Sequence, residues 1–143
     1  MKIISAQHRI DDCINIRREV FVCEQGVPEA LEIDSLDEPD SGCEHFLILD
    51  DDGRPIGTFR AYYETEDTVH LQRFCILPGE RKKGVGRAAF AFVESCYSGK
   101  GVKKITFGAQ CSAIPFYEKC GCVCVSDVFP DAGIPHRTME KTL

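Results

Sequence analysis

The chain has no apolar run approaching the roughly 20 residues that a membrane-spanning helix needs. Its first residues, Met1 to Ser5, lack the apolar core of a secretory signal, and no repeat, linker or low-complexity segment follows. With 143 residues and a net charge of -6, it also lacks the basic character that nucleic-acid binders show. We therefore expect one cytoplasmic domain, residues 1–143, with neither a membrane nor a nucleic acid as partner. A homodimer is compatible with the sequence, which does not reveal an oligomeric state.

Nine cysteines are present, but no two form a C-x-x-C pair, so the sequence gives no support for a zinc site or another metal centre. Thiols stay reduced in the cytosol, which argues against a disulfide framework. Cys120, Cys122 and Cys124 alternate as small apolar side chains do at the start of a strand. We interpret the cysteines as buried structural thiols.

The chain also lacks the two common phosphate-binding loops. Neither Gly84 nor Gly86 is followed by the Lys-Ser or Lys-Thr of a P-loop, and Arg-Ala-Ala after Gly86 breaks the dinucleotide fingerprint. What is present is a basic segment, Arg81-Lys82-Lys83-Gly84-Val85-Gly86-Arg87, between an apolar strand pattern and a helical pattern. Free N–H groups at a helix N-terminus attract anions such as pyrophosphate, and glycines let a ligand approach the backbone. The alternative is a basic first turn on an ordinary amphipathic helix.

Periodicity and turn residues predict alternating strands and helices. We expect strands over residues 2–5, 44–50, 55–64, 69–77, 103–108, 122–129 and 136–141, and helices over about 11–23, 84–98 and 113–120. We interpret residues 24–42 as an acidic loop that could contain one helical turn. The passage through Gly84 should be a crossover that joins two parallel strands.

The spacing Arg81-x-x-Gly84-x-Gly86 resembles the acetyl-CoA signature [QR]-x-x-G-x-[GA] of the GCN5-related N-acetyltransferases (GNAT). This resemblance implies an α/β (α+β) GNAT fold with a mixed, mostly antiparallel central sheet and helices on both faces. In that family the strand before the signature binds pantetheine through its backbone, and the glycine turn binds the pyrophosphate. The positions that match these two roles are Phe74, Cys75 and Ile76, followed by Arg81, Lys82, Lys83, Gly84, Val85, Gly86 and Arg87.

A second segment, Ile114-Pro115-Phe116-Tyr117-Glu118-Lys119-Cys120-Gly121-Cys122, resembles the A-x-x-F-Y-x-K-x-G-F segment of the same family, with Cys122 replacing the last Phe. The family's Tyr protonates the departing CoA thiolate, a role that the resemblance assigns to Tyr117. Phe116 would contact the cofactor beside it. Gln110 stands where the family often has an Asn that holds pantetheine, and Ser112 is an alternative contact. Tyr117 could instead be a half-buried packing residue.

The sequence offers two histidines as the general base, because an imidazole titrates near neutrality. His70 stands where some members carry a Glu on the strand before the signature, whereas Ile105 fills the other Glu position and cannot serve. His136 belongs to Gly133-Ile134-Pro135-His136, which resembles the ElaA/YjcF-like branch of the family, as does the segment Arg18 to Pro28. Either histidine could be structural, and Glu24, Glu32 and His45 are lesser candidates.

The resemblance implies transfer of an acetyl group from acetyl-CoA, as cosubstrate, to a primary amine by direct attack in a ternary complex. A route through an acetylated Cys75 is less favoured, because a strand cysteine is more often a packing residue. Arg73 could bind a substrate carboxylate or form an ion pair with one of the many acids. The alternatives are a non-catalytic acyl-CoA sensor on the same fold and a nucleotide binder that uses the glycine turn alone. The acceptor amine, a small molecule or a peptide, is not identified.

Overall fold

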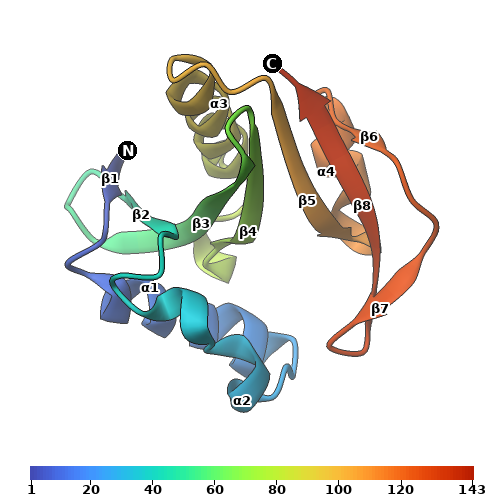
Figure 1. Cartoon of the computed structure of the whole chain (residues 1–143). Helices are drawn as coiled ribbons and strands as arrows, with labels where there is room; N and C mark the ends of the chain where they lie inside the picture. The colour runs from blue at the N-terminus through green and yellow to red at the C-terminus, as the bar shows by residue number, and fades with distance from the viewer.

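Eight strands form one sheet in the computed structural model, which describes residues 1–143 (Figure 1). Their order is β1-β2-β3-β4-β5-β8-β6, and β7 pairs with β8. All pairs are antiparallel except β4 with β5, so the predicted mixed sheet and its parallel pair are confirmed. The strands are β1 (Lys2–Ser5), β2 (Glu44–Leu49), β3 (Pro55–Thr65), β4 (Thr68–Ile76), β5 (Lys104–Gln110), β6 (Val123–Cys124), β7 (Phe129–Asp131) and β8 (Ile134–Thr142).

Helices cover both faces of this sheet, as predicted. The longer ones are α1 (Ile10–Arg17), which runs into the π-helical segment η1 (Arg18–Glu24), and α3 (Val85–Ser98). The short ones are α2 (Glu29–Glu32), η2 (Ser35–Asp37), η3 (Pro78–Glu80), η4 (Cys111–Ala113) and α4 (Ile114–Lys119). Apolar side chains of α1 and η1 pack on one face against Leu47, Leu49 and Cys75, whereas α3 and α4 pack in the larger cluster on the other face. No helix has the length and apolar character that crossing a bilayer requires.

The sheet opens between β4 and β5, where the two halves in Figure 1 diverge. Only Thr68 to His70 of β4 pair with β5, opposite Lys104 to Thr106. Further along β4 the register with β3 shifts, and Arg73 adopts a left-handed φ of 55°. Such a bulge bends a strand and redirects its side chains. The β5-facing edge of residues 71–76 is therefore left without a strand partner, and that edge borders the site described below.

The predicted strand over residues 122–129 is wrong in its second half. Only Val123 and Cys124 pair with β8 as β6, and pairing resumes at β7. The reason lies at Ser126, whose Oγ accepts the Thr138 N–H at 2.8 Å while its carbonyl accepts Arg137 Nε at 2.9 Å. The Ser126 side chain thus takes the place of a main-chain acceptor, so the Thr138 N–H stays hydrogen-bonded where the main chain leaves the sheet.

The interpretation of the cysteines as buried thiols is correct for four of the nine and wrong for Cys23, which is exposed. The buried ones are Cys13, Cys43, Cys75 and Cys122, and the other four are half-buried. All nine are free thiols. Cys23 stands near the end of η1, in which Val20 is buried and the residues after it are half-buried or exposed.

Candidate active site

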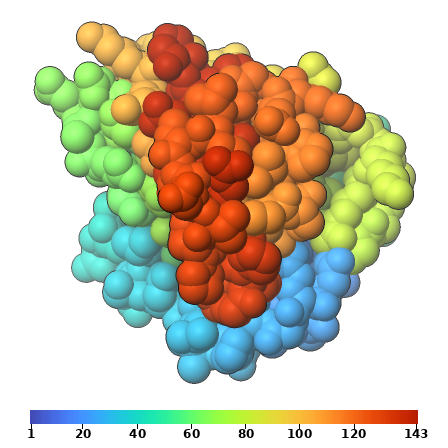
Figure 2. Space-filling view, turned by 90° about the vertical axis from the view of Figure 1, so that its right-hand side faces the viewer, coloured from blue at the N-terminus to red at the C-terminus, as the bar shows by residue number.

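A cavity of about 810 Å³ lies where β4 and β5 diverge. Its walls come from both strands, from η1 and α2, from α4 and from the β7–β8 hairpin. In Figure 2 this hairpin, coloured orange to red, lies in front of the blue and cyan segment, and residues of both line the cavity. The predicted site residues in the wall are His70, Phe74, Cys75, Ile76, Arg81, Lys82, Gly86, Gln110, Phe116, Tyr117 and His136. Those outside it are Lys83, Gly84, Val85, Arg87 and Ser112.

The glycine turn leads from η3 into α3 through two left-handed residues, Lys82 with φ 63° and Gly84 with φ 82°. Gly84 caps α3 without a side-chain acceptor, so the N–H groups of the first turn have no partner within the helix. At Gly86 a Cβ would stand 3.3 Å from the Phe116 ring, so a side chain there would require the ring to shift by a few tenths of an ångström. Main-chain donors are thus exposed beside the cavity, an arrangement that suits an anion.

The positive charge predicted at this turn is smaller than the sequence suggested, because the Arg81 side chain is already engaged. Its guanidinium forms a bidentate ion pair with Glu24, with both N–O distances 2.7 Å, and its Nε donates to the Ile76 carbonyl at 2.9 Å. Lys83 lies 3.3 Å from Glu80. Lys82 and Arg87 make no ion pair and supply the uncompensated charge. Arg81 therefore ties η1 to the turn and to the end of β4.

A second link crosses the opening from η1 to β5, where Gln110 Nε2 donates to Gln25 Oε1 at 2.7 Å. Gln110, the position predicted to hold pantetheine, is at the end of β5 and in the cavity wall. Its amide keeps a free carbonyl oxygen, since a primary amide carries both donors and acceptors. The last residue of η1, Glu24, and the next residue, Gln25, therefore contact opposite sides of the opening. No local sequence pattern predicts these contacts.

Tyr117 lies on α4 and is 8% exposed, within a cluster of aromatic rings. The centroid of its ring is 4.5 Å from that of Phe107, 5.0 Å from that of Phe116 and 6.3 Å from that of Phe74. Its hydroxyl has no hydrogen-bond partner in the protein, and Tyr117 contributes to the cavity wall. Burial raises the pKa of Tyr117, so the phenol keeps its proton. A buried, protonated phenol facing a cavity can donate that proton.

The two candidate histidines lie in the same cavity wall with different partners. His70 Nδ1 is 2.9 Å from Glu64 Oε1 and 3.1 Å from Thr106 Oγ1. Burial lowers the pKa of His70, and Glu64 opposes this only in part, so the imidazole is neutral at physiological pH. His136 Nδ1 is 2.7 Å from the Ile134 carbonyl. The sequence predicts no role for Glu64, because it belongs to no motif. Only the pairing of β3 with β4 brings it next to His70.

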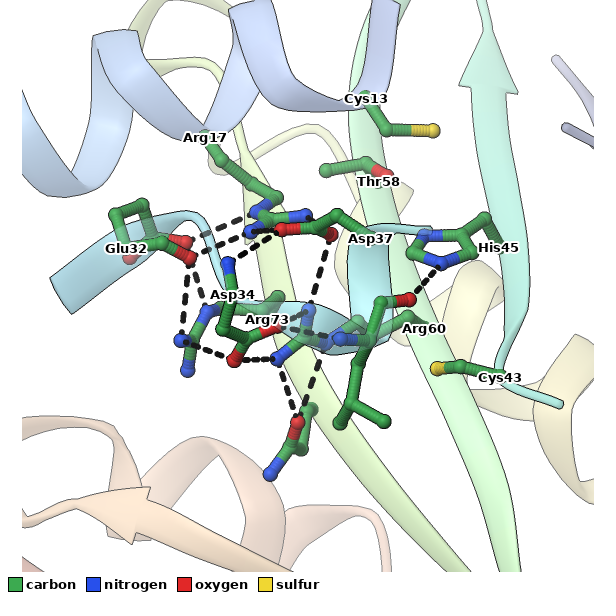
Figure 3. A network of polar contacts seen from close by, with 12 residues as sticks. Cys13, Arg17, Glu32, Asp34, Asp37, Cys43, His45, Thr58, Arg60 and Arg73 are labelled. Atoms are coloured by element: carbon green, nitrogen blue, oxygen red, sulfur yellow. Dashed lines mark hydrogen bonds and ion pairs between the residues drawn. The ribbon is translucent and has the colours of Figure 1, made fainter. Parts of the chain in front are cut away.

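The sequence left two roles open for Arg73, binding a substrate carboxylate or forming an ion pair within the protein. The structure shows the ion pair. It belongs to a buried network in which three arginines meet three acids across α1, α2, η2 and the sheet (Figure 3). Its Nε is 2.7 Å from Glu32 Oε2, and the same oxygen lies 2.9 Å from Arg17 Nε. The Glu32 carboxylate thus lies between two guanidiniums, which gives it a structural role in this network.

The remaining candidates either lie outside the cavity wall or are unsuited to the chemistry. His45 is buried beneath η2, with its Nε2 2.8 Å from the Leu36 carbonyl, and is not part of the cavity wall. Cys75 is in the wall, but burial raises the pKa of its thiol, so the thiolate needed for an acetyl-cysteine is disfavoured. The exposed Ser112 lies outside the wall.

Comparisons with known proteins show which family and which solved structures this chain resembles. Residues 10–143 match the family profile described as "Acetyltransferase (GNAT) domain". The uncharacterized N-acetyltransferase YjcF of Bacillus subtilis is 35% identical over 144 residues, covering 99% of both chains. A putative N-acetyltransferase from Lactobacillus plantarum superposes with a TM-score of 0.89 at 26% identity, over 99% of this chain and 97% of that one. An aminoglycoside 6'-N-acetyltransferase complexed with coenzyme A shares the fold, with a TM-score of 0.76 at 18% identity over 99% and 97% of the chains.

Proposed function

Because this chain belongs to the GNAT acetyltransferase family, as the match over residues 10–143 shows, we propose that it transfers an acetyl group from acetyl-CoA to a primary amine. The amine attacks the thioester carbonyl directly, in a ternary complex. The observation that carries the proposal is the shared cavity, which joins the unpaired edge of β4, the glycine turn and Tyr117. A cytoplasmic location and a single domain over residues 1–143 belong to the same proposal.

The cosubstrate fits this cavity on three counts. The β5-facing edge of β4 has main-chain groups without a strand partner, which an extended pantetheine with its amides can satisfy. The turn before α3 offers free N–H groups and the charges of Lys82 and Arg87 to the diphosphate. Gly86 leaves room beside Phe116. Other acyl-CoA thioesters share these features, so the acetyl group itself is part of the proposal.

The reaction needs a proton donor for sulfur and an acceptor for the amine proton. The amine nitrogen forms a bond to the carbonyl carbon, the carbon–sulfur bond breaks, and the thiolate takes the Tyr117 phenol proton. His70 takes the proton from the new ammonium. Leu71 packs in the same cluster as Tyr117, whereas its neighbour His70 faces the other side of β4, since side chains alternate along a strand. Acid and base thus approach from opposite sides of the opening.

Turnover with a Tyr117→Phe variant tests the proposal. CoA release is screened across a library of small amines and peptides, and the responding substrate is then used for both proteins. We expect unchanged acetyl-CoA affinity and a fall in kcat of at least about 100-fold, the low end for loss of an acid catalyst. Tyr63→Phe, a change at an exposed tyrosine outside the cavity, is the matched control. Equal turnover of the two variants would remove Tyr117 from the mechanism.

The second candidate is a non-catalytic acyl-CoA sensor on the same fold. It uses the same β4 edge and glycine turn, but it gives no role to a protonated tyrosine beside the thioester. Acetyl-CoA binding without CoA release for any amine would favour it. Stabilisation by ATP and not by acetyl-CoA in a thermal-shift assay would instead indicate a nucleotide binder.

A further inference from the structure

We propose that Glu64 holds His70 in the orientation and tautomer in which Nε2 accepts the proton of the attacking amine. This inference rests on the proposed function. In it His70 is the catalytic base, and Glu64 is a positioning residue that acts only through the imidazole.

The placement follows from the register of the sheet. Tyr62 of β3, His70 of β4 and Thr106 of β5 are successive cross-strand partners, and Thr106 pairs in turn with Glu140 of β8. Residues paired in register show their side chains on the same face, so His70 has a neighbour on each side. Glu64 lies two residues beyond Tyr62, where the register shifts between Tyr63 and Thr65, and its carboxylate contacts His70. This row stands at the point where β4 and β5 stop pairing, which is the base of the cavity.

The two contacts of Nδ1 set the state of the ring. A carboxylate accepts hydrogen bonds only, so the contact of Glu64 Oε1 with Nδ1 at 2.9 Å favours the tautomer with the hydrogen on Nδ1. Thr106 Oγ1 is hydrogen-bonded to the same nitrogen at 3.1 Å, and this hydroxyl can accept from Nδ1 in that tautomer. Nε2 then carries the free electron pair, and it has no partner in the protein. When Nε2 takes a proton, the Glu64 carboxylate stabilises the imidazolium that forms.

His136 lacks this support. Its Nδ1 contacts the neutral Ile134 carbonyl at 2.7 Å, and its ring stacks on Phe129 with centroids 6.0 Å apart. A carbonyl fixes the tautomer as a carboxylate does, but it stabilises a developing positive charge less, because it carries no net charge. The carboxylate therefore favours His70 over His136 as the base.

The other groups that face His70 leave Glu64 as its single charged partner. The Tyr62 ring lies 5.2 Å away, centroid to centroid, and burial raises the pKa of its phenol, so it stays neutral. On β5 and β8 the nearest charges in the row, Lys104 and Glu140, lie 3.6 Å from each other and compensate one another. Loss of Glu64 should therefore lower the pKa of His70, since the carboxylate raises it against burial.

The test compares Glu64→Gln with Glu66→Gln, an exposed acid two residues away that makes no ion pair. Imidazole titration by NMR on the protein without substrates gives the first readout, with His70→Gln to assign the resonance. We expect His70 to titrate at lower pH in Glu64→Gln than in wild type or in Glu66→Gln. The second readout is the pH profile of acetyl transfer. Its acidic limb should move to lower pH and kcat should fall about tenfold, the scale of a hydrogen bond to a charged group, while the KM for the amine stays unchanged.

Glu64→Asp, which keeps the charge, should recover most of the wild-type profile, whereas a merely structural loss would not be rescued in this way. An unshifted His70 titration with transfer intact in Glu64→Gln would overturn the inference and leave the proposed function standing. A shifted titration in a protein that acetylates no amine would refute the proposed function instead.

Discussion

Asp37→Asn is the change that tests most sharply how the wall of the cavity is held together. Asp37 accepts from both terminal nitrogens of Arg17, at 2.5 and 2.9 Å, and from Arg60 Nη1 at 3.0 Å. Both guanidiniums are 1% exposed. Removing the carboxylate takes one of the three acids from this network, and η2, which carries Asp37, loses its ion pairs to the buried Arg17 and Arg60 (Figure 3).

The magnitude follows from the pKa of Asp37. Burial alone would raise it, but the hydrogen bonds from Arg17 and the Asp34 backbone and the charges of Arg17 and Arg60 lower it from 3.8 to about 2. At about 1.36 kcal/mol for each pKa unit, this lowering of the pKa corresponds to about 2.5 kcal/mol of stability. Breaking a buried pair by removing one partner costs about 3–5 kcal/mol in measured cases. We therefore expect Asp37→Asn to lose roughly 3 kcal/mol at neutral pH.

The contribution also has a defined pH window. Because the folded-state pKa is depressed, the stabilisation is present above the unfolded value of 3.8 and is lost as the pH falls towards 2. Urea unfolding of the variant and wild type at neutral and acidic pH measures both effects, with Asp40→Asn, an exposed acid without an ion pair, as control. A loss as small as that of Asp40→Asn, or a difference that does not shrink in acid, would refute the reasoning.

Two further predictions concern the glycine turn. Gly86→Ala should keep the fold, since alanine suits a helix, but it should weaken acetyl-CoA binding about tenfold, because the new methyl group displaces the Phe116 ring and covers main-chain donors. Gly79→Ala, at a site with open space, is the calorimetric control and should bind normally. Glu24→Gln should tighten acetyl-CoA binding at low salt by exposing the Arg81 charge, and the gain should vanish at high salt. Equal affinity of Glu24→Gln and wild type at low salt would show that this charge is not felt at the diphosphate.

Much of this arrangement follows from local patterns in the sequence. The turn residues Asp51 to Arg54 end β2 and begin β3 as predicted, and Gly121, with φ 88°, follows α4 as its expected C-terminal cap. The helix predicted over about 11–23 is present, but its second half is π-helical, which apolar periodicity alone does not distinguish from α. Local sequence patterns predict the structure correctly where a few adjacent residues determine the backbone conformation.

The parts that escaped prediction depend on partners distant in sequence. The basic segment contains four positively charged side chains, yet Glu24, 57 residues earlier, forms an ion pair with Arg81. Glu64 acquires a role only when the register of β3 and β4 sets it beside His70. The end of β6 depends on a hydrogen bond from Thr138 to Ser126. In each case the deciding partner belongs to another element, so no window of sequence contains the information.

A crystal structure of the protein with CoA would show directly whether the unpaired edge of β4 and the glycine turn bind the cosubstrate. We expect the pantetheine arm along the unpaired edge of β4, the sulfur next to Tyr117, and the diphosphate on the main-chain amides from Lys82 to Arg87. A complex in which CoA binds elsewhere, with this edge and the glycine turn free of it, would contradict the account.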